Sequence, residues 1–157
     1  MSCSCCGQDK PTVAPRSRRD VALCRNCAGW LVGQLGVIST PILPVADMRE
    51  AIAFYERAGF GVRIYNDGAG AEPGFAFVDH DGQSVFDLDA FGDLEPSANN
   101  AGCYLVVEDA DVWHGRLLDA GFTVTPIADQ PWGMREFAFD DPSGNHIRVG
   151  RGIAEDD

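Results

Sequence analysis

The 157-residue sequence has no apolar run that approaches the roughly 18 residues of a membrane-spanning helix. Its first residues, MSCSCCGQDKP, lack the apolar segment of a secretory signal. It also lacks the compositional extremes of disordered or collagen-like chains, since 45% of its residues are hydrophobic and 23% are charged. We therefore expect a cytoplasmic globular protein without a membrane partner.

Basic residues are scarce and unevenly placed. The chain has 12 Lys and Arg against 24 Asp and Glu, which gives a net charge of −12. Residues 1–30 carry five basic and two acidic residues, so the other 7 basic and 22 acidic residues give the rest of the chain a net charge of −15. This acidity argues against a nucleic-acid partner and favours a cationic ligand, although it also serves solubility.

Only one cysteine, Cys103, lies beyond residue 27, and its apolar surroundings predict a small buried side chain. The other cysteines include two C-x-x-C pairs at a spacing typical of structural zinc sites. Free or redox-active thiols and disulfides are the alternatives. We predict that residues 1–36 form a zinc-ribbon-like segment whose Zn²⁺ is bound by Cys3, Cys6, Cys24 and Cys27, with Cys5 able to replace Cys3 or Cys6.

Residues 37–151 contain an internal repeat, followed by an acidic tail at 152–157. A shift of 62 positions aligns the second half with the first without a gap, and both halves contain an AGF and an FAF sequence. The repeat is longer than a solenoid unit, so it indicates two copies of one supersecondary module.

Each copy predicts the same order of elements, βαβββ. Asp47 and Asp109 are typical helix N-caps, and Gly59 and Gly121 are typical C-terminal caps. The expected strands cover residues 38–45, 62–65, 75–79 and 84–89, then 102–107, 122–127, 136–140 and 146–150. The sequence therefore predicts an α+β fold in which two tandem βαβββ modules form a curved mixed sheet around a cleft, with the helices outside.

This pattern resembles the vicinal oxygen chelate superfamily of glyoxalase I, extradiol dioxygenases and bleomycin-resistance proteins. The segment QPWGMREFAFDDPSGN at residues 130–145, followed by HIRVG, is similar to the resistance proteins, as are STPILPVAD and AFYERAGF. The resemblance implies a non-catalytic protein that sequesters a planar, cationic, bleomycin-like antibiotic. It also implies a homodimer with the cleft between subunits, in which Pro41 is the hinge of an exchanged N-terminal arm.

The superfamily's enzymes hold a divalent ion at four strand positions, which the resemblance places at Thr40, Phe86, Gly102 and Arg148. These residue types do not bind such an ion, although a strand bulge could bring Asp87 to the place of Phe86. We therefore expect no metal in the cleft and no metal-dependent catalysis. The alternatives are a metal-dependent lyase or oxidoreductase of this superfamily, or a zinc-ribbon adaptor with a ligand-sensing domain.

Alternation along the strands places Phe86 and Leu88 on the concave face, together with Tyr104, His146 and Arg148. Trp132, held between Pro131 and Gly133, either stacks on a flat ligand or fills the core. The resemblance makes Phe75 the opposing stacking residue, and Asp87 and Asp89 would attract a cationic ligand. The predicted ligand-binding residues are Phe75, Phe86, Asp87, Tyr104, Trp132, His146 and Arg148.

Overall fold

The structure is a computed structural model that describes residues 12–13, 23–24, 39–65 and 72–153, and its chain divides into two units, Met1–Ser39 and Thr40–Asp157. In the first unit, β1 (Thr12–Val13) pairs antiparallel with β2 (Leu23–Cys24). The zinc site remains a prediction, because the described residues do not include Cys3, Cys5, Cys6, Cys27 or the side chain of Cys24. Residues 154–157 of the predicted acidic tail also lie outside them.

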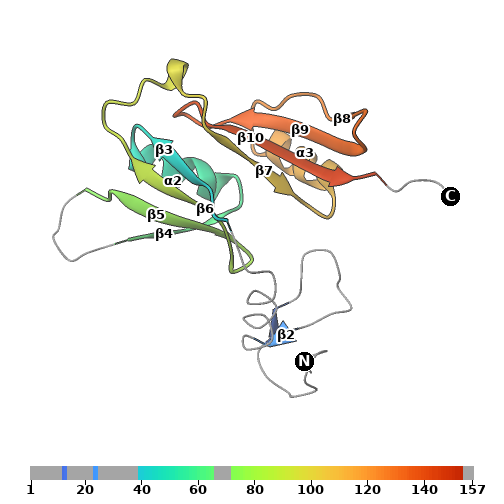
Figure 1. The fold of residues 1–157 in the computed structure, drawn as a ribbon, viewed down its shortest axis with the longest axis horizontal. Coiled ribbons are helices and arrows are strands. Elements are labelled where there is room, and N and C mark those ends of the chain that lie inside the picture. The colour runs from blue at the N-terminus through green and yellow to red at the C-terminus, as the bar shows by residue number, and fades with distance from the viewer. Residues whose placement is uncertain (1–11, 14–22, 25–38, 66–71, 154–157) are drawn as a thin grey trace. The chain divides into compact units, whose positions relative to one another are not determined.

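The first half of the second unit is a βαβββ module (Figure 1). Its elements are β3 (Ile42–Val45), α2 (Met48–Arg57), β4 (Gly61–Ile64), β5 (Phe75–His80) and β6 (Gln83–Ala90). The strands form one sheet in the order β3-β6-β5-β4, in which β3 and β6 are parallel and the other neighbours are antiparallel.

The second half repeats this arrangement after the short helix η1 (Pro96–Ala98). Its elements are β7 (Gly102–Val106), α3 (Ala110–Asp119), β8 (Ala128–Asp129), β9 (Met134–Asp140) and β10 (His146–Gly152), with the sheet order β7-β10-β9-β8. The predicted α+β fold of two βαβββ modules is confirmed. The described strands of the two modules form two four-stranded sheets instead of one continuous sheet.

Both helices begin and end at the predicted residues. The Asp47 side chain accepts a hydrogen bond from the Glu50 backbone N–H at 3.0 Å, and Asp109 accepts from two backbone N–H groups of the first turn of α3. Gly59 and Gly121 follow the helices with φ of 92° and 79°, the left-handed conformation that favours glycine. Within the described residues, no helix has the length and apolar character needed to cross a bilayer.

The strand predicted at residues 122–127 is wrong in position, because β8 covers only Ala128–Asp129. Pro126 has no N–H to donate to a strand ladder. Thr125 instead pairs with β9 at one residue, donating its N–H to the Ala138 carbonyl and accepting the Ala138 N–H with its hydroxyl oxygen.

The predicted orientation of β6 is also wrong. Phe86 and Leu88 were expected on the concave face, but both are fully buried in the core. The gap-free alignment of the two repeats pairs Phe75 with Phe137. In the structure, the pairing of β5 with β6 instead makes Ala76 the equivalent of Phe137. The true offset in these strands is 61 residues, and a shift of one residue exchanges the two faces of a strand.

The two modules share a hydrophobic core that the helices help to close. Phe54 of α2 packs edge-on against Phe122 of the second module, with ring centroids 4.9 Å apart. Phe60 lies beside Trp113 of α3 at 5.4 Å. The residues that close the core therefore come from both repeats.

A buried polar turn, residues 141–145, also joins the modules. The Asp141 carboxylate accepts from the Tyr55 hydroxyl at 2.8 Å, from the backbone N–H groups of Ser143 and Asn145, and from the Asn145 side chain. The Asn145 amide also donates to the Pro44 carbonyl, and the Ser143 hydroxyl oxygen accepts the Ala46 N–H. Burial and the Asp141 charge raise the pKa of Tyr55 well above its ordinary value, so its hydroxyl remains a donor.

Replacing Tyr55 with Phe removes one donor from Asp141 and keeps the ring. Because hydrogen bonds to charged groups contribute about 1.5–3 kcal/mol, we expect Y55F to lower the free energy of unfolding by about 2 kcal/mol in urea denaturation. Tyr65→Phe is the matched control, since Tyr65 is 56% exposed and its ring contacts Phe77. Equal stabilities of the two variants would contradict the role of the turn.

Candidate functional site

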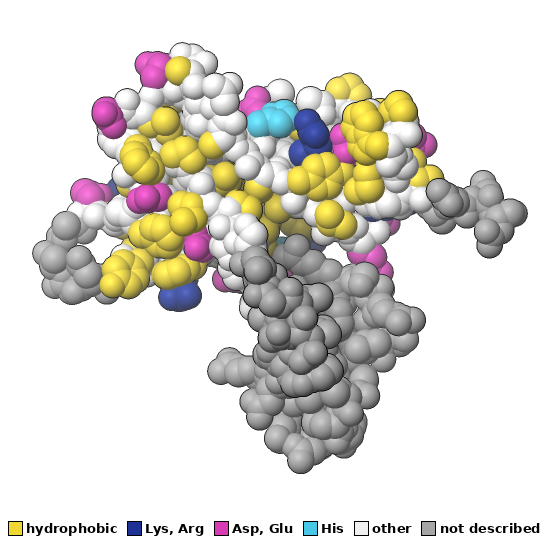
Figure 2. Space-filling view, in the orientation of Figure 1, with side chains coloured by type: hydrophobic (Ala, Val, Ile, Leu, Met, Phe, Trp, Pro, Cys, Tyr) yellow, Lys and Arg dark blue, Asp and Glu magenta, His cyan; other side chains and the backbone are white. Residues whose placement is uncertain are grey.

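Each sheet has one face in the core and one face that its helix does not cover. The first open face carries Ile42, Arg63, Phe75, Phe77, Asp87 and Asp89, and the second carries Tyr104, Glu136, Asp140, His146 and Arg148. In Figure 2, acidic and hydrophobic side chains are visible over the first module, while basic and histidine side chains adjoin hydrophobic ones over the second. These two faces contain all the predicted ligand-binding residues except Phe86 and Trp132.

Asp87 on the first open face has an unsatisfied carboxylate oxygen. The strand pairing places it between Ile42 and Phe77, and its buried Oδ1 has no hydrogen-bond partner among the described residues. Burial raises the pKa of Asp87, and the Arg63 charge offsets part of this effect. The Arg63 guanidinium lies 4.4 Å from the centroid of the Phe77 ring.

The four positions that the resemblance assigns to a metal differ in their surroundings. Thr40 is exposed ahead of β3, and Phe86 is in the core. At Gly102 a Cβ would overlap the carbonyl oxygen of His146, so no side chain fits there. In the strand pairing, Asp87 on the first open face is equivalent to Arg148 on the second open face. Among the described residues, no group of three or more His, Cys, Asp or Glu side chains could hold a metal ion.

On the second open face, three side chains form a connected polar group. The Tyr104 hydroxyl donates to Glu136 Oε2 at 2.6 Å, and Arg148 Nε lies 3.8 Å from Glu136 Oε1. Tyr104 reaches Glu136 across Gly150, where a Cβ would overlap the hydroxyl and lie 2.9 Å from the Glu136 Cβ. Burial, followed by the hydrogen bond to Glu136, raises the pKa of Tyr104 to about 12.

His146 lies on the same face, two residues before Arg148. Its Nδ1 is 2.7 Å from Asp140 Oδ1, and both side chains are at least half exposed. Cys103, on the opposite side of β7, packs against the core as predicted, and burial raises the pKa of its thiol to about 11. A thiol with this burial and this raised pKa is a poor nucleophile.

Trp132 lies at the tip of the β8–β9 hairpin and is 62% exposed, so it does not fill the core. The hairpin closes through hydrogen bonds from Gln130 N–H to the Met134 carbonyl and from Gly133 N–H to the Gln130 carbonyl, with Gly133 at φ 79°. This turn holds the indole outward from a defined backbone.

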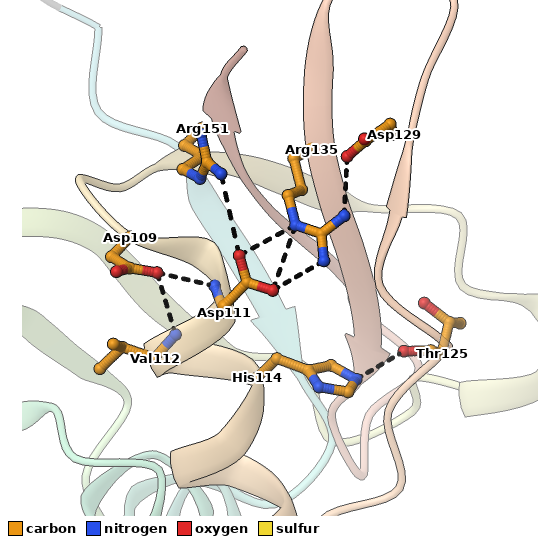
Figure 3. Close-up of polar contacts among 8 residues, drawn as sticks. All are labelled: Asp109, Asp111, Val112, His114, Thr125, Asp129, Arg135 and Arg151. Atoms are coloured by element: carbon orange, nitrogen blue, oxygen red, sulfur yellow. Dashed lines mark hydrogen bonds and ion pairs between the residues drawn. The ribbon is translucent and has the colours of Figure 1, made fainter. Parts of the chain in front are cut away.

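An ion-pair network braces the base of that hairpin (Figure 3). Arg135 of β9 contacts Asp111 in the first turn of α3 at 2.8 Å and Asp129 of β8 at 2.7 Å. Arg151 of β10 also approaches Asp111, at 3.9 Å. The hydrogen bond from Arg135 lowers the pKa of Asp111. The two strands that carry Trp132 are thus tied to each other and to α3.

A separate shallow pocket of about 280 Å³ lies at the end of β3 and contains none of the predicted ligand-binding residues. It is lined by Pro44, Phe91, Asp93, Leu94, Glu95 and Ala98.

Sequence reasoning missed Glu136 and Gly150, which hold Tyr104 and Arg148 in place. The signal available in the sequence was Gly150 itself, because a glycine inside a strand often marks a close approach of neighbouring groups. Sequence reasoning also missed Ile42 and Phe77, although Ile42 is the repeat equivalent of Tyr104 and Phe77 shares the face of Phe75.

Comparisons with known proteins agree with this architecture. The family model for the Glyoxalase/Bleomycin resistance protein/Dioxygenase superfamily matches residues 34–149. A bleomycin resistance protein of Klebsiella pneumoniae is 28% identical over 119 residues, which cover 71% of this chain and 89% of that protein.

Two solved structures are similar along nearly their whole length. A bleomycin-binding protein complexed with bleomycin is 25% identical, with a TM-score of 0.63 over 74% of this chain and 98% of that chain. A bleomycin resistance determinant encoded on the transposon Tn5 is 25% identical, with a TM-score of 0.65 over 75% of this chain and 99% of that chain.

Gly150→Ala tests the polar group on the second open face. The added methyl should separate Tyr104 from Glu136, so the pKa of Tyr104 should fall from about 12 toward the ordinary tyrosine value. Ultraviolet titration of tyrosinate measures this shift, with Tyr104→Phe to assign the signal. Gly152→Ala, whose Cβ would meet no atom within 4 Å, is the control. An unchanged titration of Tyr104 in G150A would show that the raised pKa of Tyr104 does not depend on the close packing at Gly150.

Proposed function

This chain belongs to the Glyoxalase/Bleomycin resistance protein/Dioxygenase superfamily, and from this premise we propose that it is a non-catalytic small-molecule binding protein of the bleomycin-resistance type. Its role is to sequester a planar, cationic ligand such as a bleomycin-like antibiotic. The names of the relatives support this proposal, since they include a resistance protein and a bleomycin-binding protein.

The exposed indole of Trp132 carries the proposal. An aromatic side chain that is 62% exposed and held on a braced hairpin loses little conformational freedom when a flat ligand stacks on it. Phe75 and Tyr104 provide further aromatic surface on the two open faces. Stacking on these rings requires no covalent step.

Charge supports a cationic group on the ligand. Asp87 and Asp89 lie on the same face, and the Asp87 carboxylate accepts no hydrogen bond at its buried Oδ1 from the described residues. A cationic group of the ligand would pair with this carboxylate and compensate part of its desolvation.

The residues at the superfamily's metal positions support binding over catalysis. Thr40 is exposed, Phe86 is in the core, Gly102 has no room for a side chain, and Arg148 is cationic. Asp87 alone would supply one carboxylate, whereas a catalytic divalent ion needs several ligands.

The proposed cofactor is one structural Zn²⁺ in residues 1–36, bound by Cys3, Cys6, Cys24 and Cys27.

The proposed cleft lies between the two subunits of a homodimer. Apolar side chains on the open faces support this arrangement, since Ile42 is 57% and Val106 59% exposed. Such surface favours burial against a second copy with closed symmetry.

Sedimentation velocity tests the dimer. We expect a dimer at micromolar concentrations, and Val106→Asp should weaken it by placing a charge on the second open face. Val112→Asp is the control, because Val112 is equally exposed but lies on α3. A monomer at all concentrations would refute the proposed interface.

Calorimetric titration with metal-free and copper-loaded bleomycin tests the function. We expect 1:1 binding per chain and an affinity about tenfold lower in Trp132→Ala, because loss of an aromatic stack costs about 1.4 kcal/mol. Leu118→Ala, which also removes an exposed apolar side chain, should leave the affinity unchanged. Absence of binding by the native protein would contradict the proposed ligand class.

A further inference from the structure

Arg148 is the cationic side chain on an open face that is otherwise rich in carboxylates. It is half exposed, and its guanidinium donates no hydrogen bond to the described residues. Its nearest carboxylate oxygen, Glu136 Oε1, is 3.8 Å from Nε, beyond hydrogen-bond distance. The other nitrogens of the guanidinium therefore have donors available to a ligand.

The neighbours of Arg148 are held in place. Glu136 is only 6% exposed and its second oxygen accepts the Tyr104 hydroxyl, so the carboxylate is fixed beside Arg148 Nε. The Tyr104 ring centroid lies 6.0 Å from the Arg148 guanidinium carbon. Gly150 leaves the space for this packing. The Glu136 carboxylate and the Tyr104 ring therefore restrict the Arg148 side chain before a ligand binds.

Arginine presents a planar fork of N–H donors that matches a carboxylate in a bidentate arrangement. A purely cationic ligand would be repelled by this group. The corrected register also makes Arg148 the equivalent of Asp87, so the two sheets carry opposite charges at corresponding places.

We propose that Arg148 binds a carboxylate on a planar aromatic part of the ligand, with Glu136 and Tyr104 as its positioning residues. This inference rests on the proposed function, because the aromatic part stacks in the same cleft. It changes the expected ligand class from cationic to amphoteric: Asp87 takes a cationic group and Arg148 takes an anionic one.

Paired titrations of the full chain with 2-naphthoate and 2-naphthamide test this inference. The two probes share one ring system and differ in charge. We expect the carboxylate to bind about tenfold more tightly than the amide, since hydrogen bonds to charged groups are the stronger class. Arg148→Gln should remove this preference without changing the affinity for the amide.

Two further variants sharpen the test. Arg148→Lys keeps the charge but loses the fork, so it should retain only part of the preference, and it replaces R148Q if that variant unfolds. Arg49→Gln removes the same charge from an exposed site on α2 that pairs with Glu72, and it should leave the preference intact.

The outcomes separate this inference from the proposed function. Equal affinities for both probes, unaffected by R148Q, would overturn the anionic site while leaving planar-ligand binding in place. A preference that R49Q reduces as much as R148Q does would also overturn it, because the effect would then come from net charge. If neither probe binds and bleomycin does not bind, both proposals fail.

Discussion

The buried carboxylate of Asp141 is the contact on which the arrangement of the two modules depends. It accepts donors from α2 of the first module and from its own turn in the second, while Asn145 and Ser143 extend the network to the backbone beside β3. Leaving a buried charge without its partners is costly, so these groups fix one packing of the repeats. In this packing, each four-stranded sheet keeps one face that its helix does not cover.

The two open faces show how one duplicated fold acquires different chemistry. Their strand pairing is equivalent, yet the first face carries the Asp87 carboxylate and the second carries Arg148 beside Glu136. Two-residue alternation determines which side chains reach each face. Equivalent strands of the two repeats therefore carry opposite charges at corresponding positions.

Much of this could be predicted from the sequence, because local signals dominate the modules. Asp47, Asp109, Gly59 and Gly121 cap the helices as expected. The face of Phe86 could not be predicted from the repeat, because two FAF sequences align by chance one residue out of register. The exposure of Trp132 depends on which groups brace its hairpin, and the Tyr104–Glu136 contact depends on cross-strand register. None of these follows from local patterning.

We propose that a planar ligand binds against the exposed indole of Trp132. Two-dimensional NMR of the tryptophan indole N–H groups during titration with metal-free bleomycin tests it most directly. We expect the Trp132 resonance to shift while that of Trp113, packed against the core, stays in place. A bound state in which Trp113 shifts and Trp132 does not would contradict the stacking of the ligand on Trp132.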